Sequence, residues 1–157
     1  MTAGALSDVV VLELATGVAG PYCGKLLADL GAQVVKVEPP GGDPIRNEYP
    51  LVDGESAFFN WLNANKLGVE LPYDDRRVIG LASKADIIIH DQNGPFADTL
   101  DNEFREANPH AVIVSVTPYG RSGDRAGWKA SPLTEYATSG FHYIAGDPAR
   151  EPLALPG

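Results

Sequence analysis

Residues 9–40 read VVVLELATGVAGPYCGKLLADLGAQVVKVEPP, and this stretch decides the fold class. The run from Val9 to Leu14 is short, apolar and rich in β-branched residues, which is typical of a strand buried on both faces of a parallel sheet. Gly17 and Gly20 permit a sharp turn after this strand. Pro21 fits the first position of a helix, where its missing N–H is not needed.

The second half of the stretch predicts a helix followed by another strand. Leu26, Leu27 and Leu30 are expected to form the apolar stripe of the helix, which Gly31 ends. Val34–Val37 then reads as a second buried strand. A strand–helix–strand unit of this size is typical of nucleotide-binding folds, whose ligands bind at the turn that follows the first strand.

The rest of the chain continues this alternation. The expected strands are 67–71, 85–90 and 111–116, and the expected helices are 74–84 with Asp74 as N-cap, 96–107 and 133–144. A long connection, 39–60, and an extended tail, 146–157, lack clear periodicity. We expect one domain over residues 1–157, with an α/β fold: an open, mainly parallel Rossmann-like sheet with helices on both faces.

Composition narrows the possible partners and compartments. The chain has 157 residues, 44% of them hydrophobic, and a net charge of −9. The negative charge argues against nucleic acid or an anionic membrane as partner. The single cysteine, Cys23, allows no intramolecular disulfide and fits a reducing compartment. No stretch reaches the length of a membrane span, so we expect a cytoplasmic protein.

The residues alone favour some kinds of functional site over others. Glu38 lies where an NAD-binding unit places its ribose-binding acid, but the first turn lacks the G-x-G-x-x-G pattern. The three histidines lack metal-ligand spacing, so no metal is expected. A serine-hydrolase elbow, G-x-S-x-G, is absent. Arg121, Arg125 and Lys129 form a basic cluster on a Gly-rich loop, which would suit a phosphate-bearing ligand.

Five sequence blocks in register resemble the family III CoA-transferases, the CaiB/BaiF group, which includes the α-methylacyl-CoA racemases. The blocks are VVVLELATGVAGPYCGKLLADLGAQVVKVEPPGGDPIR (9–46), NANKLGVEL (63–71), ADIIIHDQNGP (85–95), NPHAVIVSVTPYGRSGD (108–124) and ATSGFHYIAGDPAREPLALPG (137–157). The resemblance covers nearly the whole chain and implies the N-terminal part of the CaiB/BaiF fold.

The resemblance implies coenzyme A, bound as a substrate rather than as a tightly held cofactor, at the ends of the strands. By position it assigns the coenzyme contacts to eight residues, which are Val18, Ala19, Gly20, Arg46, Lys66, Asp91, Gln92 and Lys129. The first three would lie near the thioester and pantetheine. Lys66, Asp91, Gln92 and Lys129 would hold the nucleotide end.

The resemblance also implies a reaction. Family transferases move CoA between carboxylic acids through an aspartyl-acyl anhydride and an aspartyl-CoA thioester, which is covalent catalysis in two steps. By position their aspartate would follow Gly157, so we expect no catalytic residue in these 157 residues. Relatives are longer and form interlocked dimers, so the expected partners are an acyl-CoA, a carboxylic acid, and a second copy or a complementary C-terminal segment.

Two other functions remain as hypotheses for a protein of this fold. A non-catalytic CoA-binding or scaffold protein is favoured by Asp91-Gln92-Asn93, which replaces the more usual Asn-Phe-Arg, and by Ser131-Pro132. A racemase is disfavoured, because Ser131-Pro132 stands where racemases carry a His-Asp pair. We therefore expect CoA-transferase activity at the level of the family, and we expect these 157 residues to be inactive by themselves.

Overall fold

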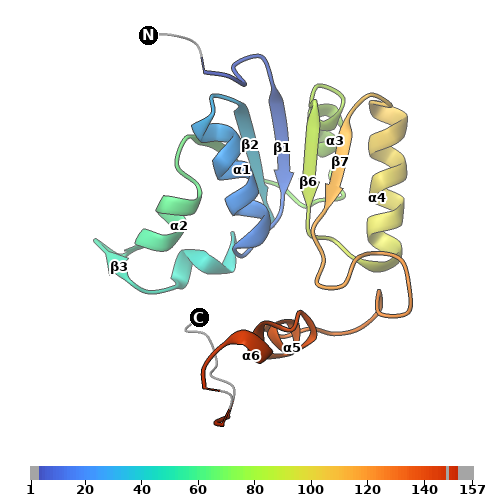
Figure 1. Cartoon of the computed structure of the whole chain (residues 1–157). Coiled ribbons are helices and arrows are strands. Elements are labelled where there is room, and N and C mark those ends of the chain that lie inside the picture. Colours follow the sequence, from blue (N-terminus) through green and yellow to red (C-terminus); the bar gives the residue numbers. More distant parts are fainter. Residues whose placement is uncertain (1–3, 148, 152–157) are drawn as a thin grey trace. The chain divides into compact units, whose positions relative to one another are not determined.

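The computed structural model describes residues 4–147 and 149–151, and it divides into two compact units, Met1–Thr117 and Pro118–Gly157 (Figure 1). The first unit contains the sheet, and the second contains two short helices. The expectation of a single domain over residues 1–157 stays a prediction. The extended tail predicted for 146–157 lies largely outside the described residues.

The first unit is built on one parallel sheet of five strands in the order β5-β2-β1-β6-β7. Its strands are β1 (Val10–Leu14), β2 (Gln33–Glu38), β5 (Lys66–Glu70), β6 (Ile87–His90) and β7 (Val112–Ser115). The helices of this unit are α1 (Ala19–Asp29), α2 (Ala57–Leu62), α3 (Arg76–Ala82) and α4 (Gly94–Ala107). The predicted open, parallel α/β fold is confirmed.

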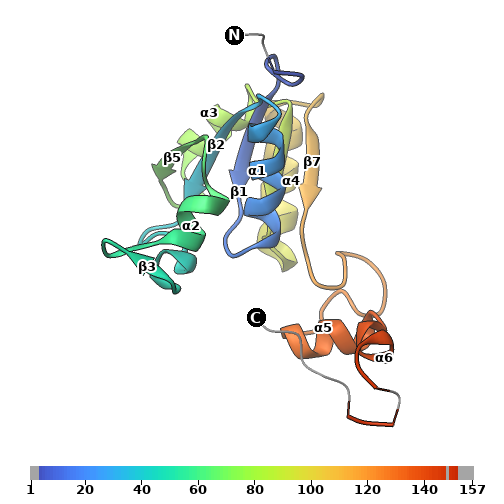
Figure 2. The same ribbon diagram turned by 60° about the vertical axis from the view of Figure 1, so that its left-hand side comes forward.

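Helices cover both faces of the sheet, because alternate side chains of each strand point to opposite sides. On one face Leu12 packs in a cluster with Val78 of α3 and Phe104 of α4. On the other face Val11 packs with Ala28 of α1. Figure 2 shows α1 and α4 on opposite sides of the sheet. The chain adds β2 and β5 on one side of β1 and then β6 and β7 on the other, so right-handed crossovers place α1 on one face and both α3 and α4 on the opposite face.

Helix α1 packs on the sheet mainly through small residues, and of the three predicted leucines only Leu27 packs against the core cluster on this face. Gly20, Gly24 and Ala28 are buried, whereas Leu26 and Leu30 are 47% and 53% exposed. The predicted leucine stripe is therefore wrong for these two positions. A side chain at position 24 would collide with the Glu13 carboxylate beneath it, so the close approach of α1 requires glycine there.

The connection 39–60 contains short elements that the sequence did not predict. They are the 3₁₀ helix η1 (Pro44–Asn47), the hairpin strands β3 (Leu51–Val52) and β4 (Glu55–Ser56), and the start of α2. Glu38 anchors this connection to β2, since its two carboxylate oxygens each accept a hydrogen bond of 2.7 Å from the Arg46 guanidinium. That pairing holds the pKa of Glu38 below its usual value.

Every predicted helix differs from the observed one at a boundary. Helix α1 begins at Ala19, so Pro21 is its third residue and not its first, and α4 begins at Gly94 rather than at residue 96. The N-cap of α3 is Asp75, whose side chain accepts a hydrogen bond from the Arg77 N–H, and not Asp74. In the second unit, the predicted helix 133–144 is divided into α5 (Pro132–Thr138) and α6 (Phe141–Ile144). Gly140 between them has φ +78°, which interrupts helical geometry. In the part of the chain that the structure describes, no helix is both long and apolar enough to cross a bilayer.

Replacing Gly24 with alanine tests the close approach of α1 to Glu13. We expect Gly24→Ala to lower the free energy of unfolding by about 1–3 kcal/mol, because the added methyl group forces the buried carboxylate to move. The matched control is Gly80→Ala in α3, where an added Cβ meets nothing within 4 Å. That control should raise stability by about 0.4–1 kcal/mol. Urea unfolding measures both, and equal effects would contradict the packing described.

Replacing Glu38 with glutamine tests the Glu38–Arg46 pair by its pH dependence. The pKa of Glu38 is lowered in the folded protein, so the pair stabilises fully above the usual glutamate value of 4.5 and loses its effect as the pH falls through the lower folded pKa. Urea unfolding from pH 7 to pH 3 should therefore show a stability gap between wild type and Glu38→Gln that is constant above pH 5 and shrinks below it. A gap that grows as the pH falls would contradict this.

Candidate functional site

The turn between β1 and α1 lies at the carboxyl edge of the sheet, where ligands bind in open α/β folds. Helix α1 begins at Ala19, and its N-cap residue, Val18, makes no capping hydrogen bond through its side chain. The first N–H groups of such a helix lack partners within the helix and carry partial positive charge. Val18 is 49% exposed, and Gly20 lies so close to the Ala15 side chain that no Cβ would fit.

The predicted residues Val18, Ala19 and Gly20 are therefore next to one another on an open helix N-terminus. Val18 offers an exposed apolar side chain, while Ala19 is exposed and Gly20 is buried. Such an end can receive a carbonyl oxygen or an anion through its amides, with an apolar contact beside it.

Lys66 is held inside the protein. Its side chain is 2% exposed, and its ammonium donates to Glu13 Oε2 at 2.8 Å, to the Pro21 carbonyl at 2.7 Å and to Asn63 Oδ1 at 2.9 Å. An ammonium has three N–H donors, so these bonds leave none for a phosphate. Burial lowers the pKa of Lys66, and the Glu13 carboxylate opposes that effect. This geometry favours a structural role for Lys66, which supports the first turn of α1.

Lys66 belongs to a network of four buried charges beneath α1. Glu13 is fully buried and binds Lys66 with one oxygen and Lys36 Nζ, at 3.1 Å, with the other. Lys36 Nζ also lies 3.0 Å from Asp43 Oδ2. The two positive and two negative charges balance, which offsets part of the cost of removing them from water.

Sequence reasoning missed three members of this network: Glu13, Lys36 and Asp43. A signal was present, since Glu13 and Lys36 interrupt apolar runs that read as strands buried on both faces. Charged residues are rarely buried without a partner. Two opposite charges in neighbouring buried strands therefore pointed to a pair, and the structure places Glu13 directly opposite Lys36 in the β1–β2 register.

Asp91 joins the end of β6 to the turn after β1. Its Oδ2 accepts hydrogen bonds from the Thr16 N–H at 2.8 Å and from the Thr16 hydroxyl at 3.0 Å. Its Oδ1 accepts a 2.6 Å bond from Gln92 Nε2. The structure thus brings the predicted residues Asp91 and Gln92 to the same edge as the turn, with the acid directed to the protein's own backbone.

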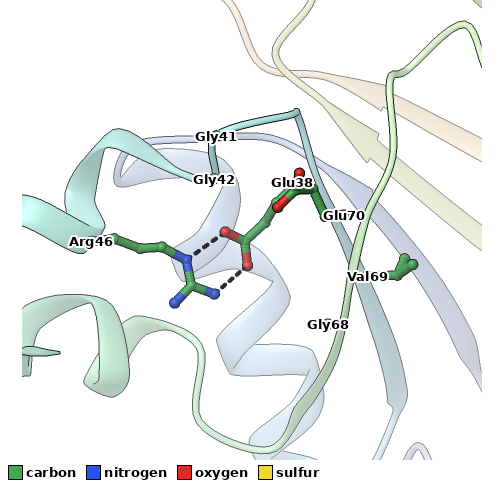
Figure 3. Close-up of a pocket in the computed structure, with 7 residues that line it drawn as sticks. All are labelled: Glu38, Gly41, Gly42, Arg46, Gly68, Val69 and Glu70. Atoms are coloured by element: carbon green, nitrogen blue, oxygen red, sulfur yellow. Dashed lines mark hydrogen bonds and ion pairs between the residues drawn. The ribbon is translucent and has the colours of Figure 1, made fainter.

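Arg46 lies on a different part of this edge, beside a cavity of about 420 Å³ that Figure 3 shows. The lining residues are Glu38, Gly41, Gly42, Arg46, Gly68, Val69 and Glu70. Arg46 points toward Glu38 (Figure 3) and stacks over the Phe59 ring at 3.8 Å. Two carboxylates and one guanidinium give the lining a net negative charge, which would repel phosphate groups.

The hydrogen bonds of Glu38 also argue against a role for this residue in binding NAD. Both of its oxygens accept from Arg46, and Oε2 also accepts from the Asp43 N–H at 3.0 Å. A ribose-binding acid needs a free carboxylate for the ribose hydroxyl groups. Glu38 therefore acts as an anchor of the connection after β2, which removes the one feature that favoured a dinucleotide.

Lys129 lies in the second unit, on the Gly-rich loop before α5, and it is exposed. In the same loop, Arg125 lies over the Trp128 ring at 5.3 Å. Within residues 4–147 and 149–151, no group of three or more histidine, cysteine, aspartate or glutamate side chains is arranged to hold a metal ion. His90, at the end of β6, is fully buried and lies 2.9 Å from Asp101 of α4, as befits a core histidine.

The chain is similar to known proteins over most of its length. The chain is 37% identical over 159 aligned positions to a succinyl-CoA:mesaconate CoA-transferase of Haloarcula hispanica, covering 91% of this chain and 40% of that protein. It is 36% identical to the succinyl-CoA:(R)-benzylsuccinate CoA-transferase subunit BbsE of Thauera aromatica, covering 90% of this chain and 37% of that protein. The chain thus spans about two fifths of the length of these relatives.

A solved structure is also similar. A CAIB/BAIF family protein from Brucella suis superposes with a TM-score of 0.89 at 29% sequence identity, covering 98% of this chain and 44% of that one. Residues 6–156 match the profile of CoA-transferase family III. The chain therefore belongs to CoA-transferase family III.

Proposed function

We propose that this chain binds the coenzyme A thioester of a CoA-transferase that exchanges CoA between carboxylic acids. The observation that carries the proposal is the uncapped N-terminus of α1 beside exposed Val18, at the carboxyl edge of the parallel sheet. Relatives named for succinyl-CoA make that thioester the first acyl donor to examine.

The proposed roles follow from the chemistry of each group. The amides of Ala19 and Gly20 would face the thioester carbonyl, whose oxygen gains negative charge when a nucleophile attacks it. The exposed Val18 side chain would contact the apolar part of the pantetheine arm. We assign binding and orientation to these residues, and we assign no nucleophile among them.

The nucleotide end of the coenzyme needs positive charge. Lys129 is exposed and is the residue we propose for the phosphates, with the Gln92 amide as a further polar contact. Arg46 keeps N–H donors beyond those bound to Glu38, so it can add a single contact. Lys66 and Asp91 take part indirectly, through the backbone that they hold.

A non-catalytic CoA-binding protein of the same fold is the second candidate. It is favoured by the acidic Asp91 in the turn after β6, where the resemblance to the family leads one to expect Asn-Phe-Arg, which carries a positive charge. The two candidates differ in one observable. Because no nucleophile is assigned among these residues, the assay uses the chain together with a complementary C-terminal segment. Transfer of CoA from succinyl-CoA to a second carboxylic acid, detected by chromatography of the thioesters, supports the transferase, whereas binding without transfer supports the alternative. A homodimer in the cytoplasm remains part of the proposal for either candidate.

Calorimetric titration with coenzyme A and with NAD tests the proposed ligand. We expect saturable binding of coenzyme A and no binding of NAD, because the turn offers an open helix N-terminus while Glu38 is occupied by Arg46. Binding of coenzyme A should weaken as salt is raised, since part of it is attraction between phosphates and lysine. Binding of NAD without coenzyme A would refute the proposed function.

A further inference from the structure

Three consecutive backbone groups of the turn after β1 are held by three charged side chains. The Ala15 carbonyl accepts a 2.7 Å hydrogen bond from Lys36 Nζ. The Thr16 N–H donates to Asp91 Oδ2 at 2.8 Å. The Gly17 N–H donates to Asp43 Oδ1 at 3.2 Å. These three side chains, Lys36, Asp43 and Asp91, come from β2, from the connection after β2 and from the end of β6, and we call them the turn-holding residues.

The turn-holding residues are themselves fixed in position. Lys36 and Asp43 are 2% and 1% exposed, and they form an ion pair with each other at 3.0 Å. Asp91 is tied by Gln92 on one oxygen and by the Thr16 hydroxyl on the other. Hydrogen bonds between a charged group and the backbone are about twice as strong as neutral ones. The three contacts can therefore determine where the turn lies.

Ala15 is buried against Gly20, but the turn beyond it has little packing of its own. Gly17 has φ +71°, and a Cβ built on it would meet nothing within 4 Å. Val18 and Ala19, the next two residues, are exposed. The side chains that hold the backbone at positions 15–17 therefore determine the position of these two exposed residues.

We propose that Lys36, Asp43 and Asp91 are positioning residues for coenzyme A, which act through the backbone of the turn and need not touch the ligand. The inference rests on the proposed function, because it concerns the same site. Rigid placement of the turn before binding lowers the ordering cost of association. Asp43 also accepts from the Ile45 N–H, so the same carboxylate links the turn to η1 and the connection after β2.

The chain offers a matched control for this idea. At the opposite end of β1, Asp86 Oδ2 accepts a 2.8 Å hydrogen bond from the Val10 N–H. Asp86 therefore makes the same kind of carboxylate–amide bond as Asp91, but to the first residue of β1, at the amino edge of the sheet, and not to the turn that follows the strand. Asp86→Ala removes an equivalent bond and leaves the proposed site unchanged.

The experiment compares three variants of the 157-residue chain: Asp43→Ala, Asp91→Ala and the control Asp86→Ala. Hydrogen exchange without ligand should be faster at the Gly17 amide in Asp43→Ala and at the Thr16 amide in Asp91→Ala. Calorimetry should show the Kd for coenzyme A raised about tenfold or more in both variants, and changed less than about twofold in Asp86→Ala. Because Asp43 is buried, an effect of its removal cannot come from a lost contact with the ligand.

Each outcome has a definite meaning. Faster exchange at Thr16 and Gly17 together with an unchanged Kd would overturn the inference while leaving the proposed function intact. No binding of coenzyme A by the wild-type chain would overturn the proposed function, and this inference with it. Asp91 is only half-buried, so if Asp43→Ala does not fold, Asp91→Ala against Asp86→Ala decides the matter by the same two measurements.

Discussion

The Lys36 ammonium, placed between Glu13, Asp43 and the Ala15 carbonyl, is the interaction on which the rest of the first unit depends. A lone charge in this position would be too costly to bury, and removing one partner of such a pair typically costs about 3–5 kcal/mol. Lys66 balances the second carboxylate charge. The face of the sheet beneath α1 thus carries a buried polar network beside the apolar cluster of Val11 and Ala28, whereas the face beneath α3 and α4 is mainly apolar.

This polar interior explains the composition of α1. The helix needs small residues, because Gly24 lies over the Glu13 carboxylate and Gly20 lies against Ala15. Larger side chains turn outward, which is why Leu26 and Leu30 are exposed. The same network places the carboxyl end of β1, so the packing of the helix and the geometry of the candidate site have one physical cause.

Much of the fold could be predicted from the sequence. Apolar runs rich in β-branched residues identified the central strands, and the order of elements predicted a parallel sheet with its ligand edge at the strand ends. The leucine error arose because residues three and four positions apart normally mark a core face, whereas here glycine and charge determine which face is buried. Helix α2 and the β3–β4 hairpin were missed because short elements carry too little periodicity to detect.

The candidate site was predictable in part. The turn at Gly17–Pro21 followed from its glycines and from its place after the first strand, whereas the assignment of Val18, Ala19 and Gly20 came from the resemblance to the family. Roles carried over by resemblance could not anticipate hydrogen-bond partners: Lys66 and Asp91 face the protein's own backbone and acids rather than open solvent. Partners of this kind depend on tertiary contacts across 45 and 75 residues of sequence, which local patterns do not encode.

We propose that coenzyme A binds at the turn after β1, and that the buried charged side chains determine the position of this turn. A titration of the ¹⁵N-labelled chain with coenzyme A, followed by amide chemical shifts, tests it most directly. We expect the largest shift changes at the amides of Val18, Ala19 and Gly20. Changes confined to the amino edge of the sheet, near Gly31 and Asp86, or none at saturating coenzyme, would contradict it.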